Sequence, residues 1–263
     1  MFLPYADDNP HTIKPVVNYT FIALNVAVFL WQLSLGETGG EAAVYAFGMI
    51  PARLFGTMTT PPELDVAPAW LTLFTSMFMH GGLMHIAGNM LYLWIFGDNI
   101  EASLGRVRYV LFYLLTGVAA ALSQAFMAPD SHVPMVGASG AISGVLGAYL
   151  VLHPRANVRV FVWLLIYFAR WNIPAFIVLG FWFVTQLLSS ASTSSGEAGV
   201  AFAAHIGGFI AGAAAVFLFK KRSVHAFETA RSQPFALETR PVRIRRGGSV
   251  PDSGWTHRRG PWG

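Results

Sequence analysis

The chain has 263 residues, of which 54% are hydrophobic and only 11% are charged, and its mean hydropathy is +0.52. A soluble globular domain carries about 25% charged residues, so this composition excludes that class. Several apolar runs approach the roughly 20 residues that cross about 30 Å of hydrocarbon, which predicts an all-α polytopic membrane protein. The sequence contains no cysteine, which excludes disulfides and thiolate chemistry.

An acidic, proline-broken segment at residues 1–15 comes first; it fits neither a signal peptide nor a transit peptide and is interpreted as a cytoplasmic N-terminal segment. The membrane domain is predicted at residues 16–219 and contains six spans. They are expected at residues 16–35, 80–96, 108–127, 139–152, 173–188 and 199–219. The fourth is short for a full crossing, so its serine end is expected to lie below the membrane surface.

Three segments outside these spans need separate interpretations. The long first loop, residues 36–68, is broken by prolines and is expected to lie in the membrane interface. Residues 158–168 are interpreted as an apolar connector near the cytoplasmic face. Residues 220–263 hold ten of the 17 Lys and Arg and lack apolar periodicity. We predict that they form a basic, disordered cytoplasmic tail that rests against anionic lipid, with no nucleic-acid partner.

The distribution of Lys and Arg over the loops sets the expected orientation of the bundle. Arg106 and Arg108 lie at the second loop, and Arg155 and Arg159 lie in the fourth, whereas the third and fifth loops carry neither Lys nor Arg. Both termini and the even-numbered loops are therefore predicted to be cytoplasmic. Ser139 follows the third loop, and His205 lies about a third of the way into the sixth span, so both are expected in the outer half of the membrane.

Few side chains inside these spans can ionise, and such residues are usually functional because they are costly in lipid. They are His80, His85 and His205, and Asn89 lies one helical turn after His85 on the same face. Spacing alone favours interhelical hydrogen bonding as the role of His85 and Asn89. No metal site is predicted, because the sequence has no HExxH motif and no acidic third ligand.

The serine that opens the fourth span, Ser139, stands among small residues in the stretch VGASGAISGVLGAYLVL. A serine at a helix start is ordinarily an N-cap, and a bare GxSG is a weak pattern. The surrounding glycines and alanines, however, let another helix approach closely. One face of the sixth span carries a second small-residue stripe, formed by Ala201, His205, Gly208 and Gly212. We expect the two stripes to pack together and to bring the hydroxyl next to the imidazole.

Ser139 and His205 together fit nucleophilic catalysis. A serine hydroxyl is a poor nucleophile until a neutral imidazole removes its proton. No carboxylate lies deep in the spans, so the two residues would act as a dyad and not as part of a triad. The tetrahedral intermediate also needs hydrogen-bond donors. The Ser139 amide is one, and His85 and Asn89 supply two more if the second span adjoins the fourth.

Three motifs in this order make the sequence resemble the rhomboid family of intramembrane serine proteases. They are HGGLMHIAGN in the second span, GASG at the start of the fourth, and AHIGGFIAG in the sixth. The resemblance implies that Ser139 is the nucleophile and His205 the general base. It also implies that His85 and Asn89 line the oxyanion hole, that His80 supports this region, and that Glu101 is structural.

The sequence departs from the family pattern at two places. Many members have a Trp-Arg pair in the first external loop, where this chain has Trp70 and Leu71. Many also have an aromatic residue four positions after the serine, which stacks on the histidine, and this chain has Ser143 there. His205 is therefore expected to be held by packing against the small stripe or by a hydrogen bond to Ser143.

The resemblance implies cleavage of single-span membrane proteins near the external face, by an enzyme of the bacterial plasma membrane that needs no cofactor. Lateral entry is expected beside the fifth span, where residues 181–183 (FWF) are either gate packing or ordinary lipid-facing bulk. A non-proteolytic rhomboid-like protein that binds membrane clients is the alternative, although such relatives typically lack the Ser or the His. A transporter or channel ranks third, because neither an inverted repeat nor a discontinuous helix pair is evident.

Overall fold

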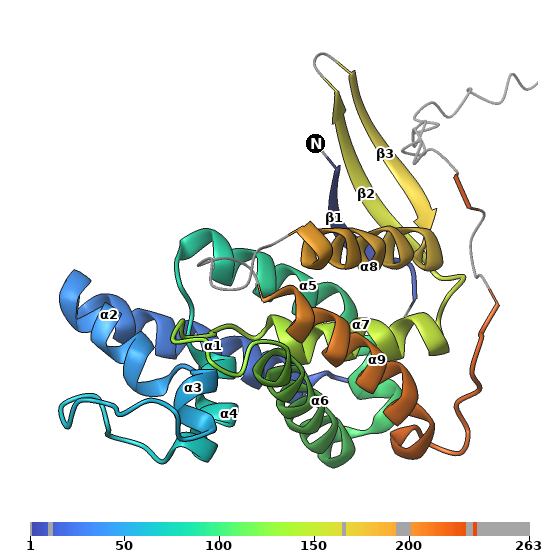
Figure 1. The fold of residues 1–263 in the computed structure, drawn as a ribbon. Coiled ribbons are helices and arrows are strands. Elements are labelled where there is room, and N and C mark those ends of the chain that lie inside the picture. The colour runs from blue at the N-terminus through green and yellow to red at the C-terminus, as the bar shows by residue number, and fades with distance from the viewer. Residues whose placement is uncertain (1, 10–12, 165–166, 193–200, 230–233, 236–263) are drawn as a thin grey trace, which may run out of the picture.

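The structure is a computed structural model that describes residues 2–9, 13–164, 167–192, 201–229 and 234–235. Helices make up most of it (Figure 1). The long helices are α1 (Val16–Ser34), α2 (Gly36–Phe47), α5 (Leu83–Leu104), α6 (Arg106–Met127), α7 (Ser139–Leu152), α8 (Ala175–Ser192) and α9 (Phe202–Phe219). Short turns of helix follow α2: α3 (Pro51–Leu54), η1 (Ala69–Leu71), α4 (Thr72–Thr75) and η2 (Ser76–Phe78).

Three of these helices, α1, α6 and α9, are long and apolar enough to cross a membrane. The helix α7 and the segment Ala175–Ser189 of α8 are shorter but also apolar. These helices confirm the predicted helical, polytopic membrane fold, while the number of six spans stays a prediction. The predicted bounds of the fourth span, residues 139–152, coincide with α7, and the start of the sixth span at residue 199 lies outside the described residues.

The centre of the bundle is α7, which packs against α5, α6, α8 and α9 (Figure 1). Almost every residue from Ala141 to Tyr149 is buried, as expected for a helix surrounded by other helices. Small residues allow this crowding. A Cβ on Gly212 would overlap the carbonyl oxygen of Gly144, and a Cβ on Gly147 would overlap that of Phe209. The two helices α7 and α9 therefore touch backbone to backbone.

A three-stranded antiparallel sheet stands at one side of the bundle (Figure 1). Its order is β1 (Phe2–Asp7), β2 (Asn157–Leu164) and β3 (Tyr167–Pro174). The interpretation of residues 158–168 as a connector is therefore corrected to a β-hairpin with the N-terminal strand beside it. Val158, Val160 and Val162 are buried and alternate with less buried neighbours, the period of two that defines a strand.

The first loop has more regular structure than its prolines suggest. Arg53 is buried and holds the loop together: its guanidinium donates to the backbone oxygen of Ala46 at 3.1 Å and to the Asp65 carboxylate at 2.8 Å. Trp70, by contrast, is 60% exposed. Arg53 thus anchors the loop in a chain that has Leu71 in place of the arginine that many rhomboids carry after the tryptophan.

The first residues after α9 also pack on the bundle. The Phe227 and Glu228 amides donate to the carbonyl oxygens of Val151 and Leu152 at 2.9 Å, and Glu228 contacts the His153 ring nitrogen at 3.0 Å. Phe227 and Glu228 are thus held at the end of α7, while the disorder of the basic tail stays a prediction. The basic tail beyond residue 235 lies outside the described residues.

Candidate active site

The hydroxyl of Ser139 and the ring of His205 form a hydrogen bond, with 2.8 Å between Oγ and Nε2. Ser139 is the first residue of α7, and His205 lies in the first turn of α9. His205 is buried, whereas Ser139 is half-buried. The hydroxyl does not cap its own helix, since α7 has no side-chain cap hydrogen bond. The structure therefore brings together the two residues that the sequence predicts to meet.

The close contact of α7 and α9 positions this pair. A Cβ on Gly208, one turn after His205, would overlap the carbonyl oxygen of Gly140, which follows Ser139. Because no side chain separates the backbones there, the first turns of both helices lie side by side. A serine and a histidine on these turns then lie within hydrogen-bond distance of one another.

Two residues of α8 hold the other edge of the His205 ring. The Gln186 side-chain oxygen lies 2.7 Å from Nδ1 of His205. The Trp182 ring packs against the imidazole with 5.8 Å between centroids and a tilt of 38°. Neither contact was expected from the sequence, because no motif marks either residue. Trp182 provides the aromatic contact that the family pattern places four residues after the serine.

Ser143 does not bind His205. Its hydroxyl, which is fully buried, donates to the carbonyl oxygen of Ser139 at 2.6 Å. The expected hydrogen bond from Ser143 to His205 is therefore replaced by the one from Gln186. Ser143 contributes to the first turn of α7 instead, where it bonds the backbone of the residue that carries the reactive hydroxyl.

His85, from the first turn of α5, faces the turn before Ser139. The backbone amide of Gly81 donates to its Nδ1 at 3.4 Å, which leaves the ring proton on Nε2. That nitrogen points at Gly137: a Cβ there would lie 2.6 Å from it. Gly137 also has φ of +124°, a left-handed conformation that side chains disfavour. Glycine is needed at this position both for the turn and for the approach of His85.

Asn89 and His80 form the layer beneath His85. The Asn89 amide nitrogen lies 3.0 Å from Nε2 of His80, and both side chains are buried. Gln32 of α1 holds the His80 backbone with two hydrogen bonds, at 3.0 and 3.1 Å. His80 thus supports Asn89 from below, and the two rings of His80 and His85 lie edge to face with 5.2 Å between centroids. The three residues predicted to form and support an oxyanion hole, His80, His85 and Asn89, thus lie together.

A cavity of about 990 Å³ joins these groups. Ser139, His205, His85 and Asn89 all line it, together with Trp182 of α8. Its volume falls in the range of ordinary ligand pockets, and it gives the hydroxyl room for a reacting group. Among the residues that the structure describes, no group of three or more His, Asp and Glu is placed to hold a metal ion.

The aromatic triplet at residues 181–183 divides between two roles. Phe181 is 72% exposed on the surface of α8, which agrees with the interpretation that it faces lipid. Trp182 turns inward to the cavity and to His205, and Phe183 stacks on Phe209 with 4.6 Å between centroids. The three residues therefore do not share one role: Phe181 is exposed, whereas Trp182 and Phe183 pack inside the bundle.

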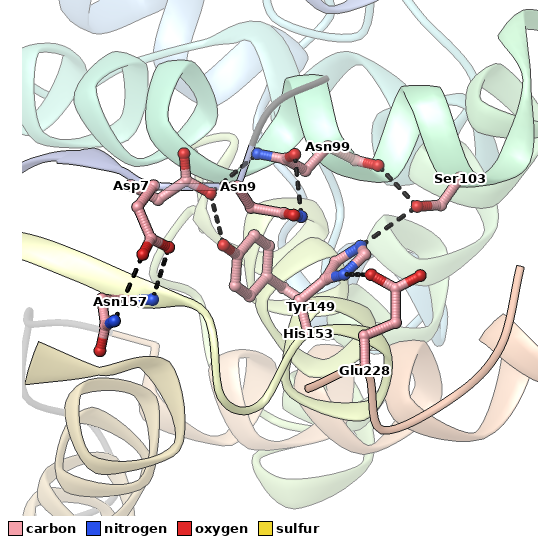
Figure 2. A network of polar contacts seen from close by, with 9 residues as sticks. Asp7, Asn9, Asn99, Ser103, Tyr149, His153, Asn157 and Glu228 are labelled. Atoms are coloured by element: carbon pink, nitrogen blue, oxygen red, sulfur yellow. Dashed lines mark hydrogen bonds and ion pairs between the residues drawn. The ribbon is translucent and has the colours of Figure 1, made fainter. Parts of the chain in front are cut away.

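A second polar cluster lies at the opposite end of α7, where the sequence analysis expected nothing (Figure 2). The Asp7 carboxylate accepts a hydrogen bond from the Tyr149 hydroxyl and one of 2.8 Å from the Asn99 amide. His153 joins Ser103 to Glu228, at 3.2 and 3.0 Å. The cluster connects the N-terminal strand, α5, α7 and the segment after α9.

Burial raises the pKa of Asp7 to about 7. The hydrogen bond from Tyr149 opposes this increase, and the nearby carboxylates of Asp98 and Asp8 contribute to it, so that about 7 is the net result. None of the residues described in this cluster lines the cavity of Ser139 and His205. The cluster therefore ties segments of the fold together and has no access to a substrate in that cavity.

A mostly helical chain with several apolar helices, packed through glycine contacts, is a polytopic membrane protein. Residues 67–222 match the Rhomboid domain family, which is more than half of the chain, and the protein belongs to this family. The Rhomboid protease GluP of Bacillus subtilis is 33% identical over 194 residues. This alignment covers 73% of the present chain but 34% of GluP, so the chain spans about a third of that relative.

Two further relatives show the range of the family. The Rhomboid protease AarA of Providencia stuartii is 28% identical over 234 residues, which are 78% of this chain and 76% of AarA. The Inactive rhomboid protein 1 of Drosophila melanogaster is 33% identical over 105 residues, which are 40% of this chain and 7% of that protein. Similarity to the family therefore supports protease activity at the level of the family, and the residues of the site must support it in this chain.

Sequence reasoning missed three parts of the site. Gln186 is one of several polar residues near the end of an apolar helix, and nothing in its neighbours marks it. Trp182 was noticed only as part of an aromatic triplet. The φ of Gly137 could have been suspected from the glycine two residues before Ser139, since a turn that opens a helix often needs one.

Proposed function

We propose that this protein is an intramembrane serine endopeptidase that cleaves single-span membrane proteins with a Ser139–His205 dyad. The observation that carries the proposal is the 2.8 Å contact between Ser139 Oγ and His205 Nε2 on the wall of the cavity. A serine that only packs between helices does not require a hydrogen bond to an imidazole. A histidine that only packs does not require an adjoining cavity. Both together meet the geometric requirement for an activated nucleophile.

The reaction begins when His205 Nε2 accepts the Ser139 proton while Oγ attacks the carbonyl carbon of the substrate. The negative charge that develops on the carbonyl oxygen needs donors already in place. The first amides of α7, which have no partner within the helix, and Nε2–H of His85 face this region. Asn89 adds its amide nitrogen, which His80 orients. The imidazolium then gives its proton to the leaving amine, and water completes hydrolysis of the acyl-enzyme.

Single-span membrane proteins are the substrates that the lipid-embedded site favours. A stable helix buries its backbone carbonyls in its own hydrogen bonds, so the substrate must unwind where Gly, Pro or polar residues weaken it. The helix α8 forms one wall beside His205, with Trp182 on the inside and Phe181 on the outside. Entry beside α8 is consistent with this arrangement.

The distribution of Lys and Arg supports an orientation with both termini in the cytoplasm and Ser139 toward the external face. The plasma membrane of a bacterial cell is the location that agrees with it. The lipid bilayer and the substrate are the partners that the proposal requires, and no cofactor takes part in the chemistry.

Cleavage of a fluorogenic single-span substrate by purified protein in liposomes tests the proposal. The wild type is expected to cleave, whereas Ser139→Ala and His205→Ala are not. If neither the wild type nor the variants cleave, labelling with a fluorophosphonate decides, because this reagent reports an activated serine without any substrate. Equal cleavage by all three proteins would refute the dyad.

A client-binding protein without protease activity is the second candidate, which the similarity to the Inactive rhomboid protein 1 favours. It predicts that the wild type is not labelled at Ser139 and that single-span proteins are retained uncut. The intact Ser139–His205 contact weighs against it.

A further inference from the structure

The side chain of Gln186 makes the only described polar contact to Nδ1 of His205, at 2.7 Å through its oxygen. The two residues come from neighbouring helices, α8 and α9, which pack against each other. The ring therefore has a hydrogen-bond partner at both nitrogens, with Gln186 on one side and Ser139 on the other.

The direction in which the Gln186 amide points is set by its own helix. Its nitrogen lies 3.3 Å from the Thr185 hydroxyl oxygen and 3.5 Å from the carbonyl oxygen of Trp182. The Thr185 hydroxyl donates its own hydrogen to the carbonyl oxygen of Trp182 at 2.6 Å. The Thr185 oxygen and the Trp182 carbonyl oxygen are therefore both acceptors for the Gln186 amide. The amide nitrogen is thus satisfied within α8, and the oxygen is left to face His205.

One proton arrangement satisfies the whole chain of contacts. The Gln186 oxygen is an acceptor only, so Nδ1 of His205 must carry the ring proton. A neutral imidazole with its proton on Nδ1 has a lone pair on Nε2, and Ser139 Oγ then donates to that lone pair. In the opposite tautomer the ring proton would lie on Nε2, between the ring and Ser139. The lone pair on Nδ1 would then face a lone pair of the Gln186 oxygen, and no hydrogen bond could form there.

We propose that Gln186 is a positioning residue that fixes His205 in the tautomer able to accept the Ser139 proton. The consequence for catalysis rests on the proposed function, but the tautomer itself does not. In the triads of soluble proteases, a carboxylate binds the corresponding nitrogen. In this chain a neutral amide oxygen occupies the corresponding place and supplies the acceptor without a charge.

The proton balance of the first step gives Gln186 its role. The Ser139 proton moves to Nε2 as the Oγ lone pair forms a bond to the carbonyl carbon, or to phosphorus when the reagent is a fluorophosphonate and fluoride leaves. The proton on Nδ1 stays there and remains hydrogen-bonded to the Gln186 oxygen. Without that acceptor, part of the His205 population carries its proton on Nε2 and cannot act as base.

Three variants of the full chain separate this role from packing. Gln186→Leu removes the acceptor at similar volume, and Gln186→Glu keeps an oxygen at the same place. Phe181→Leu changes an exposed residue of the same helix and serves as the matched control. The rate of fluorophosphonate labelling at Ser139 is measured in detergent, with Ser139→Ala as the blank. We expect a loss of about 10- to 100-fold in Gln186→Leu, less than about threefold in Gln186→Glu, and no change in Phe181→Leu.

The tautomer is read directly from the ring nitrogen signals of His205 in protein labelled with ¹⁵N-histidine, assigned by their loss in His205→Ala. We expect the wild type and Gln186→Glu to carry the proton on Nδ1, and Gln186→Leu to show both tautomers. A wild type with its proton on Nε2 overturns the inference, as does a Gln186→Leu protein with unchanged tautomer and labelling rate.

The two measurements also separate this inference from the proposed function. A wild type that carries the proton on Nδ1 but is not labelled at Ser139 supports the positioning role and counts against the protease. If Gln186→Leu does not fold, as judged by size-exclusion chromatography, the wild-type tautomer still decides.

Discussion

The two ends of α7 carry polar clusters of similar size and different design. At its first residue, Ser139 meets His205 on the wall of a cavity of about 990 Å³. In its last turn, Tyr149 donates to Asp7, which also accepts from Asn99, within a network that joins four segments of the chain (Figure 2). Both clusters contain a buried histidine and are hydrogen-bonded. Burial and hydrogen bonding therefore do not by themselves indicate an active site.

Access to the cavity is what distinguishes the two clusters. Ser139 and His205 line it, so their hydrogen bond can be exchanged for one with a substrate. The groups at the Tyr149 end are directed at one another: the Asn99 amide, for example, donates to Asp7 and accepts from Asn9. We expect changes at the first end to affect activity and changes at the second to affect stability.

The largest effect is expected from Ser139→Ala. Removal of the nucleophile should lower the rate of substrate cleavage by a factor on the order of 10⁴ or more, while the unfolding temperature in detergent stays within a degree or two. Activity is measured with a fluorogenic single-span substrate and stability by intrinsic fluorescence. A variant that loses its fold together with its activity would contradict the separation of the two ends.

The second-largest effect is expected at the contact between Gly212 of α9 and Gly144 of α7, which lies between the two ends of α7. Gly212→Ala places a methyl group against the carbonyl oxygen of Gly144, which must push α9 away from α7 and should cost about 3 kcal/mol in the free energy of unfolding. Gly180→Ala in α8 is the control, because a Cβ there meets nothing within 4 Å. Equal stability of both variants would show that the helices are not in backbone contact.

Asp7→Asn should change how stability depends on pH. Because burial raises the pKa of the Asp7 carboxyl to about 7 in the folded state, the folded protein favours the neutral acid. The protonated Asp7 carboxyl therefore contributes fully to the stability of the folded state below the ordinary pKa of an aspartic acid, near 4. This contribution is lost as the pH rises through about 7.

An asparagine at this position stays neutral, so that loss should disappear. We expect Asp7→Asn to be more stable than the wild type by about 2 kcal/mol at pH 8 and similar to it at pH 4. Unfolding temperatures across this range provide the measurement, with Asp65→Asn, at an exposed carboxylate bound to Arg53, as the comparison. A pH dependence that is the same in wild type and Asp7→Asn would exclude Asp7 as its source.

The smallest effect is expected from Tyr149→Phe, which removes the hydroxyl that Asp7 accepts and leaves the buried ring in place. Loss of one buried hydrogen bond should cost about 1 kcal/mol. Substrate cleavage should stay within about twofold of wild type, because Tyr149 is distant from Ser139 and His205 and shares no described hydrogen-bond partner with them. A large loss of activity at unchanged stability would show that the Tyr149 end controls the site.

Much of this arrangement could be predicted from the sequence because it depends on local patterns. Apolar runs marked the helices, and the bounds of α7 follow from the loop before Ser139 and the proline after His153. Small residues at helical spacing in the fourth and sixth spans predicted their contact, and through it the meeting of Ser139 with His205.

The rest depends on contacts between distant segments that leave no local pattern. Asp7 and Tyr149 are 142 positions apart, and neither belongs to a motif. Gln186 lies in an apolar helix, and only the packing of α8 against α9 gives it a role. The strand β2 is different: valine alternates with other residues, but one of the intervening residues, Phe161, is also apolar and conceals the period of two.

The N-terminal strand imposes an order on how the protein is assembled. Phe2 pairs with Val162, and Asp7 with Val158, so the residues of β1 must wait for partners made about 150 residues later in the chain. Contacts over such a separation form late, because a long stretch of chain must first be closed into a loop. By then α1, α5, α6 and α7 have all been synthesised. The strand β1 therefore closes a bundle whose helices α1, α5, α6 and α7 are already present.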